Sequence, residues 1–378
     1  MEIIAYYLPQ YYPFKENNEW WGEGFTEWTN VGKAKSLFRG HDQPKVPADL
    51  GYYDLRMAEV KEKQAALARE AGVTAFCYWH YWFGDRRVLL DLPLRQVLDS
   101  GQPDFPFCLG WANESWLAKI WNPDGTSTGK MLMEQRYPGD DDIREHFEYI
   151  RRAISDHRYL RIEDRPVFVV YKPLLHPDIC HFMNLFNKLI SASGIASAFF
   201  FIGHTVDSAE IGKIRQMGFD AVNIVRYGEH RFNKNVTKRI IWPLFKYKVL
   251  GRPLVLSYSF ISKYFIDEQT DTSPDIFPTL IPNWDHTPRS GCRGYVFQKP
   301  LPELFRRHAE QALRVTAAKT PSRQVLFVKS WNEWGEGNYM EPDLRYGKGY
   351  INALREAIDG CAAARPCTSR ACAPDTQA

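Results

Sequence analysis

Short apolar runs alternate along this chain with longer stretches in which apolar and charged residues recur at helical spacing. Such runs predict buried β-strands, and the stretches between them predict amphipathic helices. The predicted strands span residues 3–8, 73–79, 107–111, 167–171, 198–203, 221–225, 279–281 and 325–328. Strands that alternate with helices favour a parallel sheet. Eight of them, without a composition break or a flexible linker, predict an α/β fold: a single-domain (β/α)8 barrel of the TIM type with loop insertions.

Local signals place some of the helices and leave one segment open. Residues 54–71 have a helical apolar pattern that stops at Gly72, as expected for a helix ended by glycine. The acidic run 140–142 is better explained as the first turn of a helix than as a metal site. The segment 242–275 is treated as an insertion, in which residues 255–258 form either a strand or a loop that leads into a helix.

Composition narrows the class of protein. With 44% hydrophobic residues, the 378-residue chain can bury a sizeable core. The catalytic domain is expected at residues 1–358, and the Ala-, Pro-, Thr- and Ser-rich tail at 359–378 is expected to be disordered. The 48 basic and 45 acidic residues give a net charge of +3, too even to indicate nucleic acid or anionic lipid as a partner from charge alone.

Targeting signals and cysteines favour a cytoplasmic location. The N-terminus lacks the basic and long apolar regions of a signal peptide, and no apolar run reaches the length of a transmembrane segment. Cys77, Cys108, Cys180 and Cys292 are predicted to be buried free thiols in a reducing compartment. The remaining three cysteines lie in the tail, where a metal cluster is weakly supported. No metal and no cofactor is expected.

Aromatic residues are abundant, with 12 Trp, 20 Tyr and 23 Phe. Flat rings can cover the apolar C–H faces of sugars, although about half are expected to be ordinary packing residues. Aromatic and polar residues follow most predicted strands, and in a closed barrel they would converge on one pocket. The substrate-binding candidates at these ends are Tyr6, Gln10, Trp79, His80, Trp111, Asn113, Glu114, Asn283, Trp284 and Asp285. Glu27 and Trp28, in a long early loop, are expected to fold over the pocket.

The segment 331–337 carries the strongest chemical signal. It directly follows the last predicted strand and contains two carboxylates, Glu333 and Glu336. Trp331, Asn332 and Trp334 beside them are also expected to bind substrate. Paired carboxylates are what glycosidic-bond chemistry needs. In a helical turn, side chains three residues apart lie about 5–6 Å apart at Cβ. Retaining glycosidases hold their two carboxyl groups about 5–5.5 Å apart, and inverting ones about 6.5–9.5 Å apart. The spacing therefore favours a retaining enzyme. The alternative is that one carboxylate caps a helix or binds an arginine.

Five ordered motifs carry a family resemblance. They are residues 5–11 (AYYLPQY), 24–28 (GFTEW), 110–114 (GWANE), 282–289 (PNWDHTPR) and 331–337 (WNEWGEG). From residue 1 to about 358 the chain resembles the WbsX-type proteins found with bacterial O-antigen and other surface-polysaccharide genes. Those proteins are similar to glycoside hydrolase family 99, the endo-α-mannosidases.

The resemblance implies a (β/α)8 fold and a retaining mechanism through a 1,2-anhydro sugar. By motif position, Glu333 would be the base at a sugar 2-hydroxyl, and Glu336 the acid that protonates the leaving oxygen. A proton-donating Glu336 requires a raised pKa, which burial beside Trp334 could supply. Asn283, Asp285 and Arg289 would form a polar clamp on the sugar, unless that loop is held by its own hydrogen bonds.

Three functions remain open at this point. The first is a retaining glycosidase or transglycosidase that acts on an oligosaccharide or polysaccharide of the bacterial surface, lipid-linked forms included. The second is a sugar-nucleotide-dependent glycosyltransferase, for which the sequence shows no clear diphosphate site. The third is a non-catalytic glycan-binding protein, which would not need both acids. Outside the five motifs the chain departs from the endo-α-mannosidases, so the sugar and its linkage are undetermined.

Overall fold

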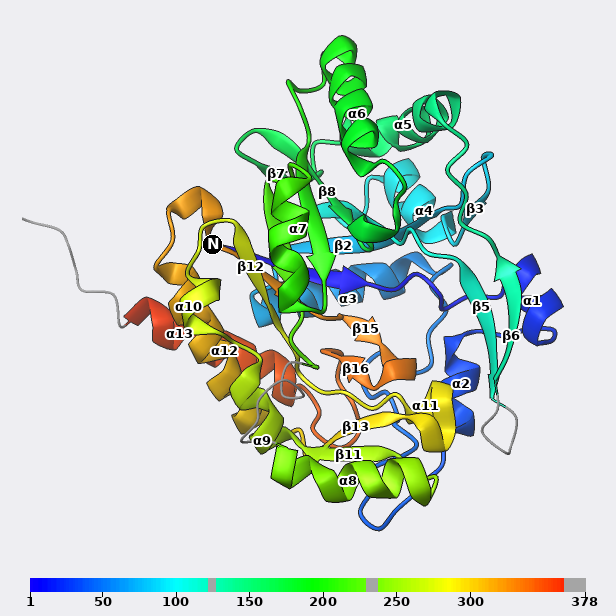
Figure 1. Cartoon of the computed structure of the whole chain (residues 1–378), viewed down its shortest axis with the longest axis vertical. Coiled ribbons are helices and arrows are strands. Elements are labelled where there is room, and N and C mark those ends of the chain that lie inside the picture. The colour runs from blue at the N-terminus through cyan, green and yellow to red at the C-terminus, as the bar shows by residue number, and fades with distance from the viewer. Residues whose placement is uncertain (122–126, 229–236, 364–378) are drawn as a thin grey trace, which may run out of the picture.

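The computed structural model describes residues 1–121, 127–228 and 237–363. Eight strands form a closed ring in the order β1–β14–β12–β10–β9–β8–β4–β2 and back to β1 (Figure 1). Every neighbouring pair is parallel. The predicted (β/α)8 barrel is therefore confirmed.

All eight predicted strands are present, with shifted ends. They are β1 (Glu2–Tyr7), β2 (Ala75–Trp82), β4 (Phe107–Trp111), β8 (Arg165–Val170), β9 (Phe200–Thr205), β10 (Ala221–Ile224), β12 (Ile276–Leu280) and β14 (Val325–Val328). Strand β2 continues three residues beyond the predicted end at Trp79, because its polar and aromatic end still pairs with β4 at His80 and with the short strand β3 (Val88–Leu89) at Tyr81 and Trp82.

Helices lie between the strands on the outside of the ring (Figure 1). They include α3 (Ala58–Ala71), α4 (Leu92–Ser100), α5 (Asp140–Ile154), α6 (Ile179–Ser193), α7 (Ile211–Gln216), α10 (Glu268–Asp271), α12 (Pro302–Ala317) and α13 (Gly349–Ala363). Helix α3 stops at Gly72, which adopts the left-handed conformation with φ of 88°. Asp140 to Asp142 form the first turn of α5, as predicted.

Insertions extend the barrel where its strands end. Helices α1 (Lys15–Trp21) and α2 (Glu27–Lys33) follow β1, and the hairpin β5 (Trp116–Trp121) and β6 (Ser127–Met133) follows β4. Helix α8 (Thr237–Val249), β11 (Leu254–Ser257) and α9 (Tyr258–Ile261) lie between β10 and β12. Helix α11 (Thr287–Ser290) and β13 (Tyr295–Gln298) follow β12, and β13 pairs in parallel with β11. Residues 255–257 thus form the end of strand β11, and residue 258 begins helix α9, so both of the predicted structures are present.

The barrel interior is filled by rings and a polar network. Tyr6 stacks on Trp79 with ring centroids 4.6 Å apart, and its hydroxyl donates to Asn223 Oδ1 at 2.8 Å. Asn223 Nδ2 in turn donates to Thr279 Oγ1 and to the backbone of Phe277. Because each of these buried polar groups has a partner, the network is a stable floor beneath the strand ends.

Two cysteine predictions are wrong. Cys77 and Cys108 are buried, but Cys180 and Cys292 are exposed. Cys180 lies in the first turn of α6, and Cys292 lies in a short turn after α11, so neither apolar neighbourhood in the sequence corresponds to a buried position.

The C-terminal boundary is also different from the expectation. Helix α13 continues through residue 358 to Ala363, and Cys361 on it is half-buried. The rest of the predicted tail lies outside the described residues. Within the described ranges, no helix has the length and apolar content to cross a membrane.

Candidate functional site

The segment that follows β14 is fastened to the ends of two other barrel strands. The backbone N–H of Lys329 donates to Leu280 of β12 at 2.9 Å, and that of Trp331 donates to Tyr6 of β1 at 2.7 Å. The Asn332 side chain accepts from the N–H of Leu8 and donates to its carbonyl. Asn332 therefore anchors the segment to β1, and this use of its amide differs from the predicted sugar contact.

Beyond Asn332 the chain makes a tight hairpin. Strands β15 (Asn332–Glu333) and β16 (Asn338–Tyr339) are antiparallel and joined by a single 3₁₀ turn, Trp334–Glu336. Gly337 has φ of 53°, and a Cβ there would meet Asp285. A Cβ at Gly335 would overlap the Glu27 carboxylate. A side chain at either position would clash with a residue of another loop, so both positions require glycine. Their small size lets the turn and its two carboxylates approach those loops.

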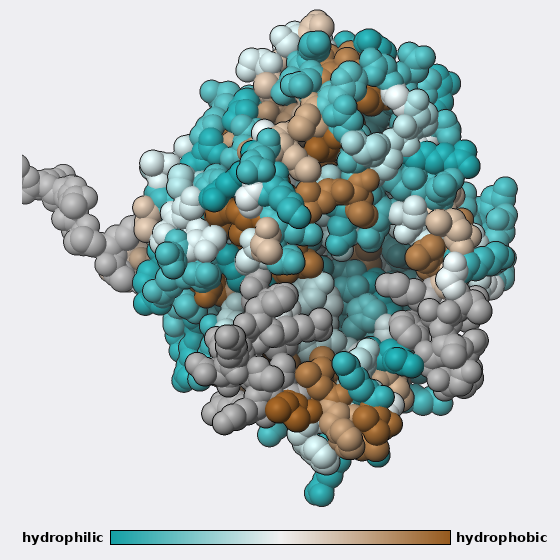
Figure 2. All heavy atoms as spheres, viewed as in Figure 1, coloured by the Kyte–Doolittle hydropathy of each residue, from teal (hydrophilic) through white to brown (hydrophobic). Residues whose placement is uncertain are grey.

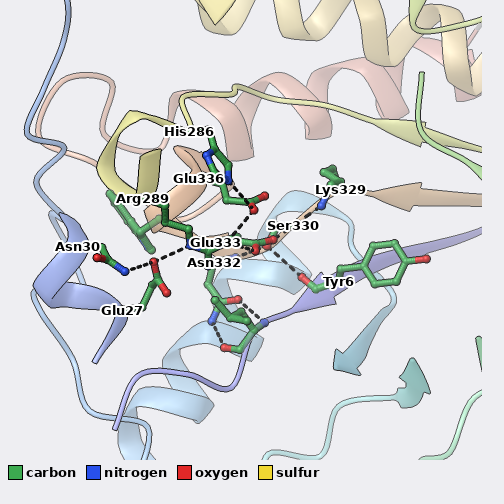
Figure 3. Close-up of polar contacts among 12 residues, drawn as sticks. Tyr6, Glu27, Asn30, His286, Arg289, Lys329, Ser330, Asn332, Glu333 and Glu336 are labelled. Carbon is green, nitrogen blue, oxygen red and sulfur yellow. Dashed lines mark hydrogen bonds and ion pairs between the residues drawn. The ribbon is translucent and has the colours of Figure 1, made fainter. Parts of the chain in front are cut away.

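A single arginine contacts three carboxylates (Figure 3). Arg289 of α11 donates from Nε to Glu27 Oε1 at 2.9 Å. Its Nη1 donates to Glu333 Oε1 at 3.0 Å and to Glu336 Oε1 at 2.7 Å. The three acids come from α2, β15 and the 3₁₀ turn, so the guanidinium joins the early loop to the loops after β12 and β14.

Two further basic groups flank the carboxylate pair. Lys329 Nζ lies 3.8 Å from Glu333 Oε2, and His286 Nε2 lies 3.4 Å from Glu336 Oε1. Both side chains are largely buried, with Glu333 10% and Glu336 15% exposed. Both carboxylates can therefore be reached from solvent while most of their surface is desolvated.

The protonation of the pair differs from the expectation. Burial, followed by the repulsion of Glu336, raises the pKa of Glu333. Burial also acts to raise the pKa of Glu336, but Arg289 and then His286 outweigh it, and this pKa is lowered. The predicted raised pKa of Glu336 is wrong in the ligand-free structure because Trp334 is not its dominant neighbour. The alternative that a carboxylate binds an arginine holds for both acids.

Glu341 is a buried acid that binds the turn of the hairpin through Trp334. It accepts hydrogen bonds from Trp334 Nε1 at 2.7 Å, Gln64 Nε2 at 2.6 Å and the Tyr53 hydroxyl at 3.0 Å. Trp334 also stacks on Tyr339 with ring centroids 3.8 Å apart. Burial raises the pKa of Glu341 to about 7, even though the three donors lower it. The position of the turn therefore depends on a buried acid that the sequence analysis missed.

Several predicted sugar platforms are packing residues. Tyr6, Trp331 and Trp334 are each 0% exposed, so the prediction that they contact substrate is wrong for this structure. Trp28 packs on Tyr11 and Trp334, and its Nε1 donates to the backbone of Tyr53. These rings fill the space under the hairpin, which is the ordinary use of large aromatic residues.

His80 and Trp111 point away from the pocket. Side chains alternate between the two faces of a strand, so neighbours of an inward residue point outward. Trp79 stacks on Tyr6 inside the barrel, whereas His80 Nε2 lies 2.8 Å from His146 of α5. Trp111 packs on His146 and Phe182, which belong to helices. The predicted substrate contacts of both residues are wrong because the predictions used position along the strand and ignored its faces.

Two of the three residues of the predicted polar clamp are already hydrogen-bonded within the protein. Asn283 bonds both the N–H and the carbonyl of Tyr339. Asp285 accepts from Thr287 and contacts His41 Nε2 at 2.8 Å. The loop is therefore held by its own hydrogen bonds, as in the alternative interpretation, and only Arg289 faces the carboxylates. Asn113 is similarly used, since its amide bonds the backbone of Lys172.

The remaining candidates lie near the carboxylate pair. Trp284 stacks on Tyr227 with centroids 4.9 Å apart, and Lys329 Nζ lies 5.5 Å from the Trp284 ring. Glu114 is half-buried and, with Glu336 and Glu333, raises the pKa of Tyr171 after burial itself. Gln10 is half-buried, and its carbonyl accepts from the N–H of Glu27.

Several residues at the site were missed by the sequence analysis. They are Tyr81, Tyr171, Tyr227, His286 and Lys329. Alternation from Trp79 would have placed Tyr81 inside the barrel, and Lys329 is the first residue after a predicted strand. Tyr227 carries no such signal, because it lies beyond the end of β10.

Comparison with known proteins identifies the family. Residues 3–354 match the family described as glycosyltransferase WbsX. The chain belongs to the WbsX family. It is 34% identical over 361 residues to a WxcX protein of Xanthomonas campestris pv. campestris, which covers 94% of this chain and 49% of that protein. A WxcX protein of strain B100 is 33% identical over 365 residues with the same coverage. This WbsX-family chain thus spans about half the length of these relatives.

Solved structures show the same fold. The GH99 endo-alpha-mannosidase from Bacteroides thetaiotaomicron aligns with a TM-score of 0.59 at 17% identity, covering 96% of this chain and 98% of that one. A glycoside hydrolase-like protein aligns with a TM-score of 0.60 at 14% identity, covering 94% and 93%. At this identity the two alignments support the barrel architecture of the WbsX-family chain.

Gly335→Ala is expected to destabilise the protein, because the added methyl group would overlap the Glu27 carboxylate that Arg289 holds. Overpacking of this kind costs about 1–3 kcal/mol. Gly32→Ala in the nearby helix α2 is the matched control, since a Cβ there meets open space and alanine favours a helix. Urea unfolding of both variants measures the difference. Equal stabilities would contradict the close packing of Glu27 on the turn.

Glu341 is expected to make stability depend on pH. Because its folded pKa of about 7 exceeds its ordinary value, folding takes up a proton between about pH 4.5 and 7. Its contribution is complete below about pH 4.5 and is lost as the pH rises through about 7, up to about 3 kcal/mol. Thermal unfolding at pH 5 and pH 8 should show a larger loss for the wild type than for Glu341→Gln, which cannot ionise there. Parallel losses in the two proteins would rule out this titration.

Proposed function

We propose that the protein is a carbohydrate-active enzyme that breaks and re-forms a glycosidic bond, with Glu333 and Glu336 as its acid–base pair. The observation that carries the proposal is that both carboxylates contact one nitrogen of Arg289 at the carboxyl ends of the barrel strands. In (β/α)8 enzymes this end of the barrel holds the active site.

The separation of the pair supports a retaining reaction. Two oxygens that lie 3.0 and 2.7 Å from the same nitrogen cannot be more than about 6 Å apart. Retaining enzymes hold their carboxyl groups about 5–5.5 Å apart, whereas inverting enzymes leave about 6.5–9.5 Å for a water molecule. The hairpin turn therefore brings the acids close enough to act on two atoms of the same sugar.

The proposed roles follow the motif. Glu333 takes the proton of the sugar 2-hydroxyl, so that the hydroxyl oxygen attacks the anomeric carbon, while Glu336 protonates the oxygen that leaves. The product of this step is a 1,2-anhydro sugar. In the second step Glu336 removes the proton of an incoming hydroxyl, whose oxygen attacks the anomeric carbon. The bond from that carbon to the 2-oxygen breaks, and Glu333 returns a proton to the 2-oxygen. Atoms and charge balance over the two steps without any further reactant.

These roles place a condition on Arg289. In the ligand-free site the guanidinium keeps the pKa of Glu336 low, whereas an acid needs its proton. Bound substrate must therefore separate Arg289 from Glu336 while Arg289 keeps its contact with Glu27. Displacing a cation from one of two neighbouring carboxylates raises the pKa of that carboxylate, so substrate binding itself would prepare the acid.

The proposed substrate is an oligosaccharide or polysaccharide of the bacterial surface, lipid-linked forms included. Membership of the WbsX family and the rings of Trp284 and Tyr227 beside Lys329 support this class. If the incoming hydroxyl belongs to a second sugar, the same two steps transfer a glycosyl group. Transglycosylation would thus agree with both the family description and the hydrolase-like fold.

A sugar-nucleotide-dependent transferase is the second candidate. It would use a cavity beside the site that is lined by Lys45, Asp285, Lys299 and Arg345 among others. Lys45 and Arg345 both contact Asp42, and His41 in the same cavity contacts Asp285. Because Lys45 and Arg345 already have a carboxylate partner, a diphosphate would have to displace that carboxylate. The carboxylate pair at Arg289 supports glycosidic-bond chemistry more strongly than this cavity supports a sugar-nucleotide-dependent transferase.

Leaving-group dependence is expected to separate the roles of the two acids. Loss of a general acid costs about 10²–10⁴-fold with a sugar leaving group but little with a leaving group that needs no proton. Glu336→Gln should therefore lose at least about 100-fold on the natural glycan and less than about tenfold on the dinitrophenyl glycoside of the same sugar. Glu333→Gln should lose heavily on both. The kcat/KM values on the two substrates provide the measurement, because they report the step that releases the leaving group and not the later step in which Glu336 acts as a base.

The control for this pair is Glu62→Gln, an exposed glutamate on α3. It should keep wild-type rates on both substrates. If the dinitrophenyl substrate rescues Glu333→Gln instead, the ionisation order of the ligand-free site also holds during catalysis and the two roles are exchanged. Full activity of both Gln variants on the glycan would remove the acid–base pair from the mechanism.

A further inference from the structure

Helix α8 turns a row of apolar side chains toward solvent. Ile241, Trp242, Phe245 and Val249 are 57%, 59%, 43% and 64% exposed. Residues four apart lie on the same face of a helix, so Ile241, Phe245 and Val249 form a line with Trp242 beside it. On the opposite side, Leu244 packs against the small apolar cluster around Leu256 and Phe297. The helix is therefore apolar on both faces, although only one of them is covered.

The sequence segment that contains this row is rich in basic residues. Residues 237–252 contain five Lys and Arg residues and no Asp or Glu, whereas the whole chain has a net charge of only +3. The remainder of the chain is thus slightly negative. Lys246 and Lys248 fall on opposite borders of the apolar row at about 100° per residue. Lys248 and Arg252 are exposed, and Lys246 Nζ lies 5.2 Å from the centre of the Trp242 ring.

The apolar side chains of α8 and the residue that follows the helix form one exposed apolar surface. Trp242 and Phe245 stack with ring centroids 5.4 Å apart, and Leu250, just after the helix, is 54% exposed. Figure 2 shows hydrophobic residues on the surface at the end of the molecule where Figure 1 places α8. A cluster of exposed large apolar residues, in contrast to a single one, indicates an interaction surface.

We propose that the exposed face of α8 docks on an anionic lipid bilayer. An interfacial helix inserts Trp, Phe and aliphatic side chains at the boundary of the acyl chains, while Lys and Arg along its borders contact acidic headgroups. The apolar row of α8 and its flanking lysines have this arrangement. A second copy of the chain fits less well, because a two-fold contact through α8 would place these cations against one another.

Docking through α8 would place the candidate site near the membrane surface. Helix α8 lies in the connection between β10 and β12, and residues just beyond those two strands, Tyr227 and Trp284, stack beside Lys329. A bilayer under α8 would therefore lie close to loops that line the site. This placement would suit a glycan that is carried on a lipid, but the docking surface does not depend on the reaction proposed above.

Vesicle co-sedimentation of the whole chain tests the proposal. The wild type should sediment with vesicles of phosphatidylglycerol and phosphatidylcholine in roughly equal amounts, and far less with phosphatidylcholine alone or at high salt. Trp242→Glu/Phe245→Glu should bind at least about tenfold more weakly. Met57→Glu/Leu344→Glu, at exposed apolar positions elsewhere, is the matched control and should bind like the wild type.

A second pair of variants isolates the charge. Lys246→Glu/Lys248→Glu should also weaken binding at least about tenfold, while Lys63→Glu/Lys188→Glu, with the same change in net charge at exposed positions on α3 and α6, should not. Unchanged binding by both α8 variants, or no binding of the wild type to either vesicle, would overturn the proposal. Self-association that Trp242→Glu/Phe245→Glu abolishes, in the absence of vesicle binding, would assign the face to a second copy instead.

Discussion

The shared guanidinium of Arg289 is the interaction on which the candidate site depends. Three carboxylates from two loops meet it, one from α2 and two from the hairpin after β14, and its charge offsets their mutual repulsion in a desolvated setting. The two glycines of the hairpin permit this approach, since Gly335 admits Glu27 and Gly337 admits Asp285. Charge pairing and backbone geometry therefore position the same turn.

Arg289 also links the structure of the site to its chemistry. Burial and then the repulsion of Glu336 raise the pKa of Glu333, whereas Arg289, which makes its closer contact with Glu336, lowers the pKa of Glu336 against the effect of burial. A ligand that draws the guanidinium away would change both values together. The contacts of Arg289 and His286 thus favour a deprotonated Glu336, whereas the proposed reaction begins with a proton on it.

Sequence reasoning predicted the architecture more fully than the site. Apolar runs identify all eight barrel strands because the strands of a parallel barrel are buried on both faces. The direction of a side chain depends on register, so His80 and Trp111 were placed in the pocket while Tyr81 was missed. The resemblance located Arg289, but its contact with both acids depends on loops that are far apart in the chain. Net charge over the whole chain likewise concealed the basic segment at α8.

The most direct measurement of the central claim is a thermal-shift comparison of the Glu336→Gln protein with surface-polysaccharide oligosaccharides and with nucleotide sugars. At about 100 times its dissociation constant a ligand stabilises the native state by about 2.7 kcal/mol, which raises the melting temperature by roughly 3 °C for a chain of this size. The account predicts such a shift with an oligosaccharide and none with nucleotide sugars. A shift with a nucleotide sugar alone would contradict it and make the protein a nucleotide-sugar-dependent transferase.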